Sequence, residues 1–276
     1  MLNALRRHWP EYLMEAAGLG IFMVSACVFA TLLEHADSPT RLAIGDPLSR
    51  RIVIGIAMGL TAVGIIYSPW GKQSGAHLNP SVTLTFLRLG KVEPWDGVFY
   101  IAAQFAGGIL GVLLGAALVG SPIAHPSVAY AVTVPGPAGP GVAWLAEFVI
   151  SFGLMLMVLI ATNTRHLARF TGLFAGALVA TYISLEAPLS GMSMNPARTV
   201  GSAVPAQLWT ALWIYFTAPP LAMLAAAEAY LRVKGARQVL CAKLHHQNTK
   251  RCIFRCGYQK QQEAEQWALP LADRTA

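Results

Sequence analysis

Six apolar segments, each close to the length needed to cross a bilayer, set the fold class of this chain. They fall at about 12–33, 52–69, 97–119, 142–162, 170–187 and 207–231. A helix needs about 20 apolar residues to span the hydrocarbon core. Only 12% of the 276 residues are charged, against about 25% in soluble domains, so the chain cannot cover itself with a polar surface. The sequence predicts an all-α membrane protein with six tilted transmembrane helices.

Basic residues indicate the orientation of these helices. They gather at the N-terminus, in the second and fourth connections and in the C-terminal tail, and include Arg6, Arg7, Lys72, Arg88, Lys91, Arg165 and Arg169. The third connection, about 120–141, contains no Lys or Arg. Because positive loops stay cytoplasmic, we expect a multi-pass protein of the inner or plasma membrane with both termini cytoplasmic. The first connection, with Arg41, Arg50 and Arg51, departs from this pattern. The net charge is +7, but the location of the charges, and not their sum, indicates topology. We expect no nucleic-acid partner.

Two connections are unusual for loops between membrane helices. Residues 74–88 read SGAHLNPSVTLTFLR, and residues 190–204 read SGMSMNPARTVGSAV. Each is too short to span a bilayer and too apolar to lie in water. Non-helical backbone at membrane depth is tolerated only where it is buried in protein or lines a cavity. Both segments are therefore predicted to be re-entrant half-helices.

The two segments also indicate an inverted repeat. Asn79 and Asn195 each follow two spans and precede a third, and Glu15 and Glu147 occupy the first span of each half. With three spans per half, the second half inserts upside down, and the two half-helices meet near the midplane. We expect a channel domain over 1–232, with repeats at about 10–120 and 140–231, and a basic cytoplasmic tail over 233–276.

Each Asn-Pro pair is a predicted helix start. Asn is a preferred N-cap and Pro is favoured at the first helical position, which assigns these roles to Asn79-Pro80 and Asn195-Pro196. A single Asn-Pro usually marks a turn, but two matched pairs favour paired half-helices. Their N-termini carry free N–H groups and partial positive charge. Such a site repels cations and protons, while a neutral molecule can still accept hydrogen bonds from the two Asn amides.

The motifs HLNPSVT and SMNPART, together with SGAH, the repeated Glu and AAQFAGG at 102–108, resemble the signatures of the aquaporin, or major intrinsic protein, family, of bacterial type. The resemblance implies two half-helices, one pore per subunit, a homotetramer and a passive channel for water rather than an enzyme, with no required cofactor. One departure is that Ser81 follows the first Asn-Pro, where Ala197 follows the second.

The resemblance also assigns the outer selectivity filter. Matching the family pattern places Met58, Ile183, Met192 and Arg198 in this ring, which is unusually apolar. An apolar ring leaves an alternative to water open: facilitated passage of small neutral solutes such as glycerol, hydrogen peroxide, ammonia or a metalloid hydroxide. We keep water as the first expectation. Thr199 after the signature Arg, by contrast, matches the water-type pattern.

Buried ionisable groups leave further alternatives open. Glu15 and Glu147 are candidates for a proton relay, or for acceptors that satisfy re-entrant backbone, and we favour the second role. His77 is either a pH gate or a fixed partner that orients the loop. An inverted-repeat secondary transporter is a remote alternative, and it would require coupling charges near the half-helices.

The tail contains a further group of potential ligands. Cys241, His245, Cys252 and Cys256, with His246 adjacent, offer four soft ligands for Zn or Fe. The spacing matches no zinc-finger pattern that we can name. Free reduced thiols are the alternative. A metal here is expected to be regulatory and separate from the pore.

Overall fold

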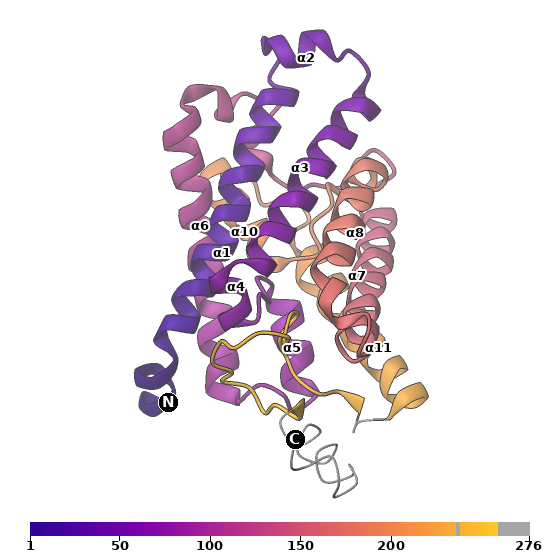
Figure 1. The fold of residues 1–276 in the computed structure, drawn as a ribbon. Coiled ribbons are helices and arrows are strands. Elements are labelled where there is room, and N and C mark those ends of the chain that lie inside the picture. Colours follow the sequence, from indigo (N-terminus) through magenta and orange to yellow (C-terminus); the bar gives the residue numbers. More distant parts are fainter. Residues whose placement is uncertain (236–237, 259–276) are drawn as a thin grey trace, which may run out of the picture.

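The computed structural model describes residues 1–235 and 238–258, and every regular element within these ranges is helical. Six helices are long and apolar enough to cross a membrane, once the short η3 (Ala168–Phe170) is counted with α8. They are α1 (Leu2–Glu34), α3 (Pro47–Tyr67), α6 (Pro94–Val119), α7 (Pro140–Thr162), α8 (Thr171–Leu185) and α11 (Leu212–Lys234). The six-span prediction is confirmed, and the helices form one bundle (Figure 1).

Both re-entrant segments contain a short helix that begins at the predicted proline. These are α5 (Pro80–Arg88) and α10 (Pro196–Ala206). A short helix that the sequence did not predict precedes each one: α4 (Pro69–Ser74) and α9 (Ala187–Ser190). The remaining short elements are α2 (Pro39–Ala43), η1 (Ser121–Ala124) and η2 (Ala129–Ala131).

The helix contacts follow the expected two-fold relationship. Helix α1 packs on α6 in the first half, and α7 packs on α11 in the second. The middle helices α3 and α8 pack on each other across the two halves. Half-helix α5 contacts α11, and α10 contacts α6, so each half-helix lies against the third long helix of the other half.

Small residues allow the long helices to approach closely. A Cβ atom on Gly107 of α6 would lie 2.2 Å from the Ala16 carbonyl oxygen of α1. In the α3–α8 pair, a Cβ on Gly59 would lie 2.5 Å from the carbonyl oxygen of Gly176. These contacts fix the bundle around the half-helices.

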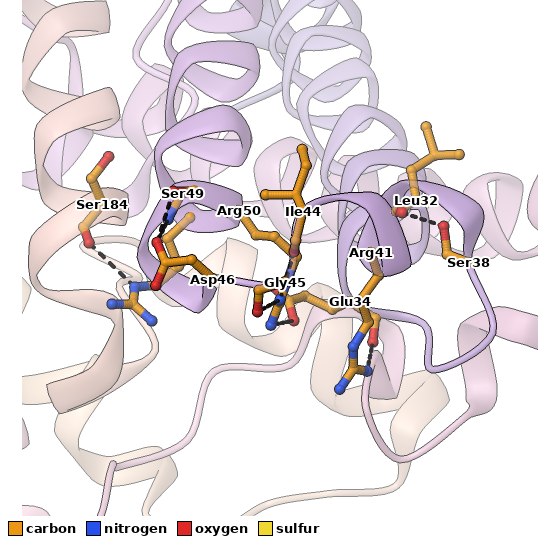
Figure 2. Close-up of polar contacts among 11 residues, drawn as sticks. Leu32, Glu34, Ser38, Arg41, Ile44, Gly45, Asp46, Ser49, Arg50 and Ser184 are labelled. Carbon is orange, nitrogen blue, oxygen red and sulfur yellow. Dashed lines mark hydrogen bonds and ion pairs between the residues drawn. The ribbon is translucent and has the colours of Figure 1, made fainter.

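The arginines of the first connection form hydrogen bonds with nearby groups of the protein, as Figure 2 shows. Arg50 pairs with Glu34 at 3.2 Å and donates to the carbonyls of Ile44 and Gly45 at 3.0 and 2.9 Å. Arg51 donates to the carbonyl of Ser184 at 3.3 Å. Arg50 therefore holds the α1–α3 connection in place, and Arg51 joins the start of α3 to the end of α8.

The described part of the tail folds back onto the bundle. Residues 238–258 lie at the same end as the N-terminus, beside α4 and α5 (Figure 1); we call this the termini end. The backbone N–H of Leu244 donates to Gly75 at 3.1 Å, and that of Arg255 donates to Lys91 at 2.9 Å. The sequence predicted a basic cytoplasmic tail over 233–276; of these residues, 238–258 pack against the channel, and 236–237 lie outside the described part. The predicted tail residues 259–276 lie outside the described part.

Candidate functional site

A cavity of about 520 Å³ runs between the two halves of the bundle. Residues 76–79 of the first re-entrant segment and 191–195 of the second are part of its lining. Its lining reaches Glu34 and Arg50 of the first connection and, at the termini end, His77 and Leu244. The half-helix N-termini therefore lie at the cavity wall, where their free N–H groups and dipoles act on its contents.

The two Asn-Pro signatures are joined by crossed hydrogen bonds. The amide nitrogen of Asn79 donates to the carbonyl oxygen of Met194 at 2.7 Å. The amide of Asn195 donates to the carbonyl oxygen of Leu78, also at 2.7 Å. Each Asn thus binds the residue that precedes the other Asn, and the two half-helix starts are held against each other.

The same side chains cap their own helices. The side-chain oxygen of Asn79 accepts from the N–H of Ser81 at 2.8 Å. The oxygen of Asn195 accepts from Ala197 and Arg198 at 3.0 and 3.2 Å. Ser81, the departure from the repeated signature, is fully buried, and its hydroxyl has no hydrogen-bond partner among the described residues.

Glu15 accepts hydrogen bonds from the first re-entrant segment. Its carboxylate binds the backbone N–H groups of His77 and Leu78 at 3.0 and 2.6 Å, and the Ser74 hydroxyl at 2.8 Å. Gln104 of α6 adds a fourth bond at 2.8 Å. Four donors converge on one fully buried carboxylate, which is the arrangement that re-entrant backbone needs.

Glu147 has the corresponding contacts in the second half. It accepts from the N–H groups of Ser193 and Met194 at 2.6 and 2.7 Å and from the Ser190 hydroxyl at 2.7 Å. These bonds match those of Glu15 to His77, Leu78 and Ser74. The second half has no counterpart of Gln104 among the bonds to this carboxylate in the described structure.

Strained backbone recurs at matched positions of the two segments. Ala76 and Leu78 have φ of 55° and 52°, and Met192 and Met194 have φ of 50° and 56°. A left-handed non-Gly residue costs about 1–3 kcal/mol and persists only where its surroundings impose it. Here the glutamate bonds impose it, because they hold the N–H groups that follow Ala76 and Met192.

The four predicted filter residues all line the cavity, and they come from three separate parts of the chain. Met58 and Met192 are buried, and Ile183 is partly exposed. The guanidinium Nη1 of Arg198 is buried and has no hydrogen-bond partner among the described residues. The cavity lining thus includes one donor without a partner in the described part of the chain, and three apolar side chains from the predicted filter.

His77 is fixed on both ring nitrogens. Its Nε2 lies 2.8 Å from the carbonyl oxygen of Ala242, and its Nδ1 lies 3.1 Å from the Thr83 hydroxyl. A carbonyl can only accept, so Nε2 carries a proton. The ring is stacked between Phe86 and Phe254, with centroids 5.2 and 5.3 Å away. These contacts match the orienting role, and two of them come from the tail.

The tail cluster differs from the prediction in one member. The potential ligand atoms of Cys241, His246, Cys252 and Cys256 all lie within 4.8 Å of one another. His245, which we predicted as the ligand, instead places its ring 5.1 Å from that of Tyr67. Neighbouring side chains on a turning backbone diverge, so the choice between two consecutive histidines depended on the tertiary fold.

Charged groups around the tail have shifted pKa values. A 2.6 Å bond to Arg255 lowers the pKa of Glu93. Burial lowers the pKa of His246, but its hydrogen bonds with Cys252 and Cys256 outweigh this effect and raise it to about 9. Hydrogen bonds with Cys241 and Cys252 lower the pKa of the Cys256 thiol.

Sequence reasoning missed several residues of the site. Gln104 was seen only within a family motif, although it joins Glu15 to Thr83, with a 3.1 Å bond to the latter. Leu244 and Phe254 were not predicted to approach the pore. No local signal marks the tail residues, because their partners lie far away in the sequence.

Comparisons with known proteins agree with this geometry. The profile of the major intrinsic protein family matches residues 4–230. Aquaporin NIP3-1 of Oryza sativa subsp. japonica is 42% identical over 64% of this chain and 55% of its own length. Aquaporin NIP6-1 of Arabidopsis thaliana is 41% identical over 74% of this chain and 65% of its own length. The chain thus spans somewhat over half the length of these two plant relatives.

A solved structure supports the fold. The aquaglyceroporin from Plasmodium falciparum superposes with a TM-score of 0.67 at 20% identity, covering 82% of this chain and 96% of that one. The relatives named above are plant proteins, so the predicted bacterial subtype gains no support from them. Together, the paired half-helices, the crossed Asn bonds and the profile match over most of the chain show that this protein belongs to the major intrinsic protein family.

Proposed function

We propose that the protein is a passive channel that conducts water through the central cavity and excludes ions and protons. The crossed bonds of Asn79 and Asn195 carry this proposal. An Asn amide nitrogen has two hydrogens. One hydrogen of each is donated to a carbonyl, which leaves the other for a molecule in the cavity.

Exclusion of cations follows from the same arrangement. The N-termini of α5 and α10 both lie at the cavity wall, and each contributes about half a positive charge. The Arg198 guanidinium adds a full positive charge. A neutral molecule exchanges its water contacts for the two amides and for Arg198 Nη1, whereas a cation meets only repulsion.

The ring of Met58, Ile183 and Met192 supports a second candidate. These apolar side chains offer no hydrogen bonds beside Arg198. A wall with few hydrogen-bond partners does not compensate water for its lost contacts, so it selects poorly for water over other small neutral molecules. Glycerol, hydrogen peroxide, ammonia and a metalloid hydroxide are therefore the alternative permeants.

An ion-coupled transporter fits this cavity poorly. Among the described residues that line it, Glu34 alone has a carboxylate, and it pairs with Arg50. Glu15 and Glu147 are occupied by re-entrant backbone. Family membership and the lack of a coupling carboxylate at the half-helices both favour a channel.

The setting of the channel belongs to the same proposal. The protein is a multi-pass membrane protein. We place it in the inner or plasma membrane of the cell, with the termini end in the cytoplasm, as the basic loops indicate. Outward-facing apolar side chains on α6, such as Leu110 and Leu118, suit contacts with lipid or with neighbouring subunits of a homotetramer.

Stopped-flow light scattering of proteoliposomes tests the proposal. The full chain, an Arg198→Ala variant and empty vesicles are compared under an impermeant osmolyte and under glycerol, with a chelator and a reductant present. Rapid shrinkage without reswelling in glycerol supports the water channel. Rapid reswelling in glycerol assigns the protein to small neutral solutes instead. Rates equal to those of empty vesicles under both shocks contradict the channel.

A further inference from the structure

The tail cluster has the geometry of a site for one metal ion. Cys241 Sγ and Cys252 Sγ are 3.6 Å apart, and Cys256 Sγ lies 3.0 Å from His246 Nε2. A tetrahedral ion with Zn–S bonds of about 2.3 Å requires sulfur atoms about 3.8 Å apart. All four ligand atoms lie within 4.8 Å of one another, so small side-chain shifts place them around one ion.

The donor set selects the kind of ion. Three thiolates and one imidazole are soft to borderline ligands, and this combination is typical of closed structural zinc sites. A cluster of several iron atoms needs ligands spread more widely than these four. A single Zn²⁺ ion is therefore the best occupant, and its binding releases the protons of those thiols that are still protonated.

A buried lysine provides independent support for negative charge at this position. Lys243 is 2% exposed, and its ammonium donates to the carbonyls of Lys250 and Arg251 at 3.1 and 2.6 Å. Within the described ranges no carboxylate forms an ion pair with it. Buried charges are normally paired. Zinc bound by three thiolates and one imidazole carries a net charge of −1, the sign that a buried ammonium favours in its surroundings.

The site is closed on one side and reachable on the other. Leu240, next to Cys241, donates its N–H to the Asn163 side chain at 2.7 Å, and Tyr258 donates to the Thr162 carbonyl at 2.5 Å. These bonds fix both ends of the cluster to the end of α7. A neighbouring cavity of about 740 Å³ is lined by His246, Cys252 and Cys256, among others. An ion can reach the ligands through it.

The same segment covers the termini end of the pore. Ala242, next to Cys241, accepts from His77, and Leu244 lines the pore cavity. In the sequence, Phe254 stands between Cys252 and Cys256, and its ring stacks on that of His77. A bond network that fixes the four ligands therefore also fixes the residues that contact the pore.

We propose that Cys241, His246, Cys252 and Cys256 bind one Zn²⁺ ion, and that this ion holds residues 238–258 over the termini end of the pore. The tail is then a metal-stabilised cover. Loss of the ion leaves the segment attached by hydrogen bonds, ring stacking and the ion pairs of Arg251 with Glu11 and Arg255 with Glu93, and these contacts open more readily than metal–ligand bonds.

Metal binding is measured on the purified full chain in detergent, after removal of metal under reducing conditions. Co²⁺ and then Zn²⁺ are titrated, with a chromogenic chelator as competitor. We expect one ion per chain and the thiolate-to-cobalt charge-transfer absorption of a tetrahedral site. His246→Gln is expected to weaken binding at least tenfold. The matched controls His245→Gln and Cys27→Ser are expected to bind as the unaltered chain does.

Hydrogen exchange and thiol alkylation of the same samples test the second half of the proposal without any measurement of permeability. Zn²⁺ should slow exchange over 238–258 and protect the three tail cysteines from maleimide in the unaltered chain and in His245→Gln, but much less in His246→Gln. The alkylation test stays informative even where a variant folds poorly, because the unaltered chain with zinc is compared with the same chain without zinc.

Several results overturn the proposal. One is a stoichiometry well below one ion per chain, another is equal loss of affinity in His245→Gln and His246→Gln, and a third is a Cys241–Cys252 disulfide that persists under the reductant. Binding without any change in exchange over 238–258 overturns the role of the ion in holding the cover. None of these readouts depends on flux through the pore. Failure of the zinc proposal can therefore be told apart from failure of the proposed channel function.

Discussion

The Phe254 ring of the tail lies almost parallel to the His77 ring of the first re-entrant segment, with centroids 5.3 Å apart and planes at 13°. Phe86 stacks on His77 as well, at 5.2 Å and 19°. A residue near the end of the described chain thus completes a three-ring stack at the pore. The tail and the half-helix share one packed core, and a change in either reaches the other.

Phe254→Ala is expected to raise the permeability of the channel several-fold. Truncation of a buried Phe costs about 3–5 kcal/mol, and here the loss falls on the contact between the tail and His77. Osmotic shrinkage of proteoliposomes measures the change. Phe174→Ala, at an exposed position on α8, is the control and should leave the rate unchanged. An equal rate for Phe254→Ala and the unaltered chain would show that the tail does not restrict flow.

Substitutions of Asn79 separate its two bonds. Asn79→Asp keeps the acceptor that caps α5 but removes the donor to Met194, whereas Asn79→Ala removes both. Loss of an N-cap costs about 0.5–2 kcal/mol. We expect both variants to lose most of the water permeability, because the free amide hydrogen is gone in each.

Proton flux in vesicles with a pH-sensitive dye completes this comparison. Asn79→Asp places a carboxylate at the meeting point of two positive helix ends and should admit protons faster than Asn79→Ala. Equal proton rates in the two variants would contradict the electrostatic barrier proposed for this point.

Glu147→Gln is expected to destabilise the protein strongly. The carboxylate accepts three hydrogen bonds in a fully buried site, and an amide turns one acceptor into a donor that faces an N–H group. Bonds to charged groups contribute about 1.5–3 kcal/mol each. The apparent melting temperature in detergent should fall markedly.

The control for this change is Glu228→Gln. Glu228 pairs with Arg88 at 2.6 Å, but both side chains are about half exposed. Exposed ion pairs contribute about 0–1 kcal/mol, so its melting temperature should stay close to that of the unaltered chain. A similar fall in both variants would argue against a special supporting role for Glu147.

Gly107→Ala is expected to prevent close packing of α1 and α6. The new Cβ would meet backbone atoms of Ala16 at 2.2–2.7 Å, and backbone cannot rotate away as a flexible side chain can. Gly64→Ala in α3 is the matched control, since nothing lies within 4 Å of its Cβ position. It should be neutral or stabilise by up to about 1 kcal/mol through helix propensity. Yield of monodisperse protein in detergent measures both, and normal behaviour of Gly107→Ala would contradict the packing argument.

The sequence by itself determined the six spans, because the length and hydropathy of a membrane helix are local properties. It also placed the two half-helices, since Asn79-Pro80 and Asn195-Pro196 define helix starts through short-range capping. The repeated positions of Glu15 and Glu147 could indicate that they bind these segments. The hydrogen bond from Gln104 to Glu15 could not be predicted in this way. The subtype and the permeant stay predictions.

The tertiary structure decided what depends on residues far apart in the chain. It selected His246 over His245 beside the cysteines, bonded the arginines of the first connection to nearby carbonyls, and laid Leu244 and Phe254 against the pore. These outcomes depend on how a turn directs neighbouring side chains and on which surface a polar tail meets. Local composition does not encode either one, and only the packed bundle supplies the partners that fix them.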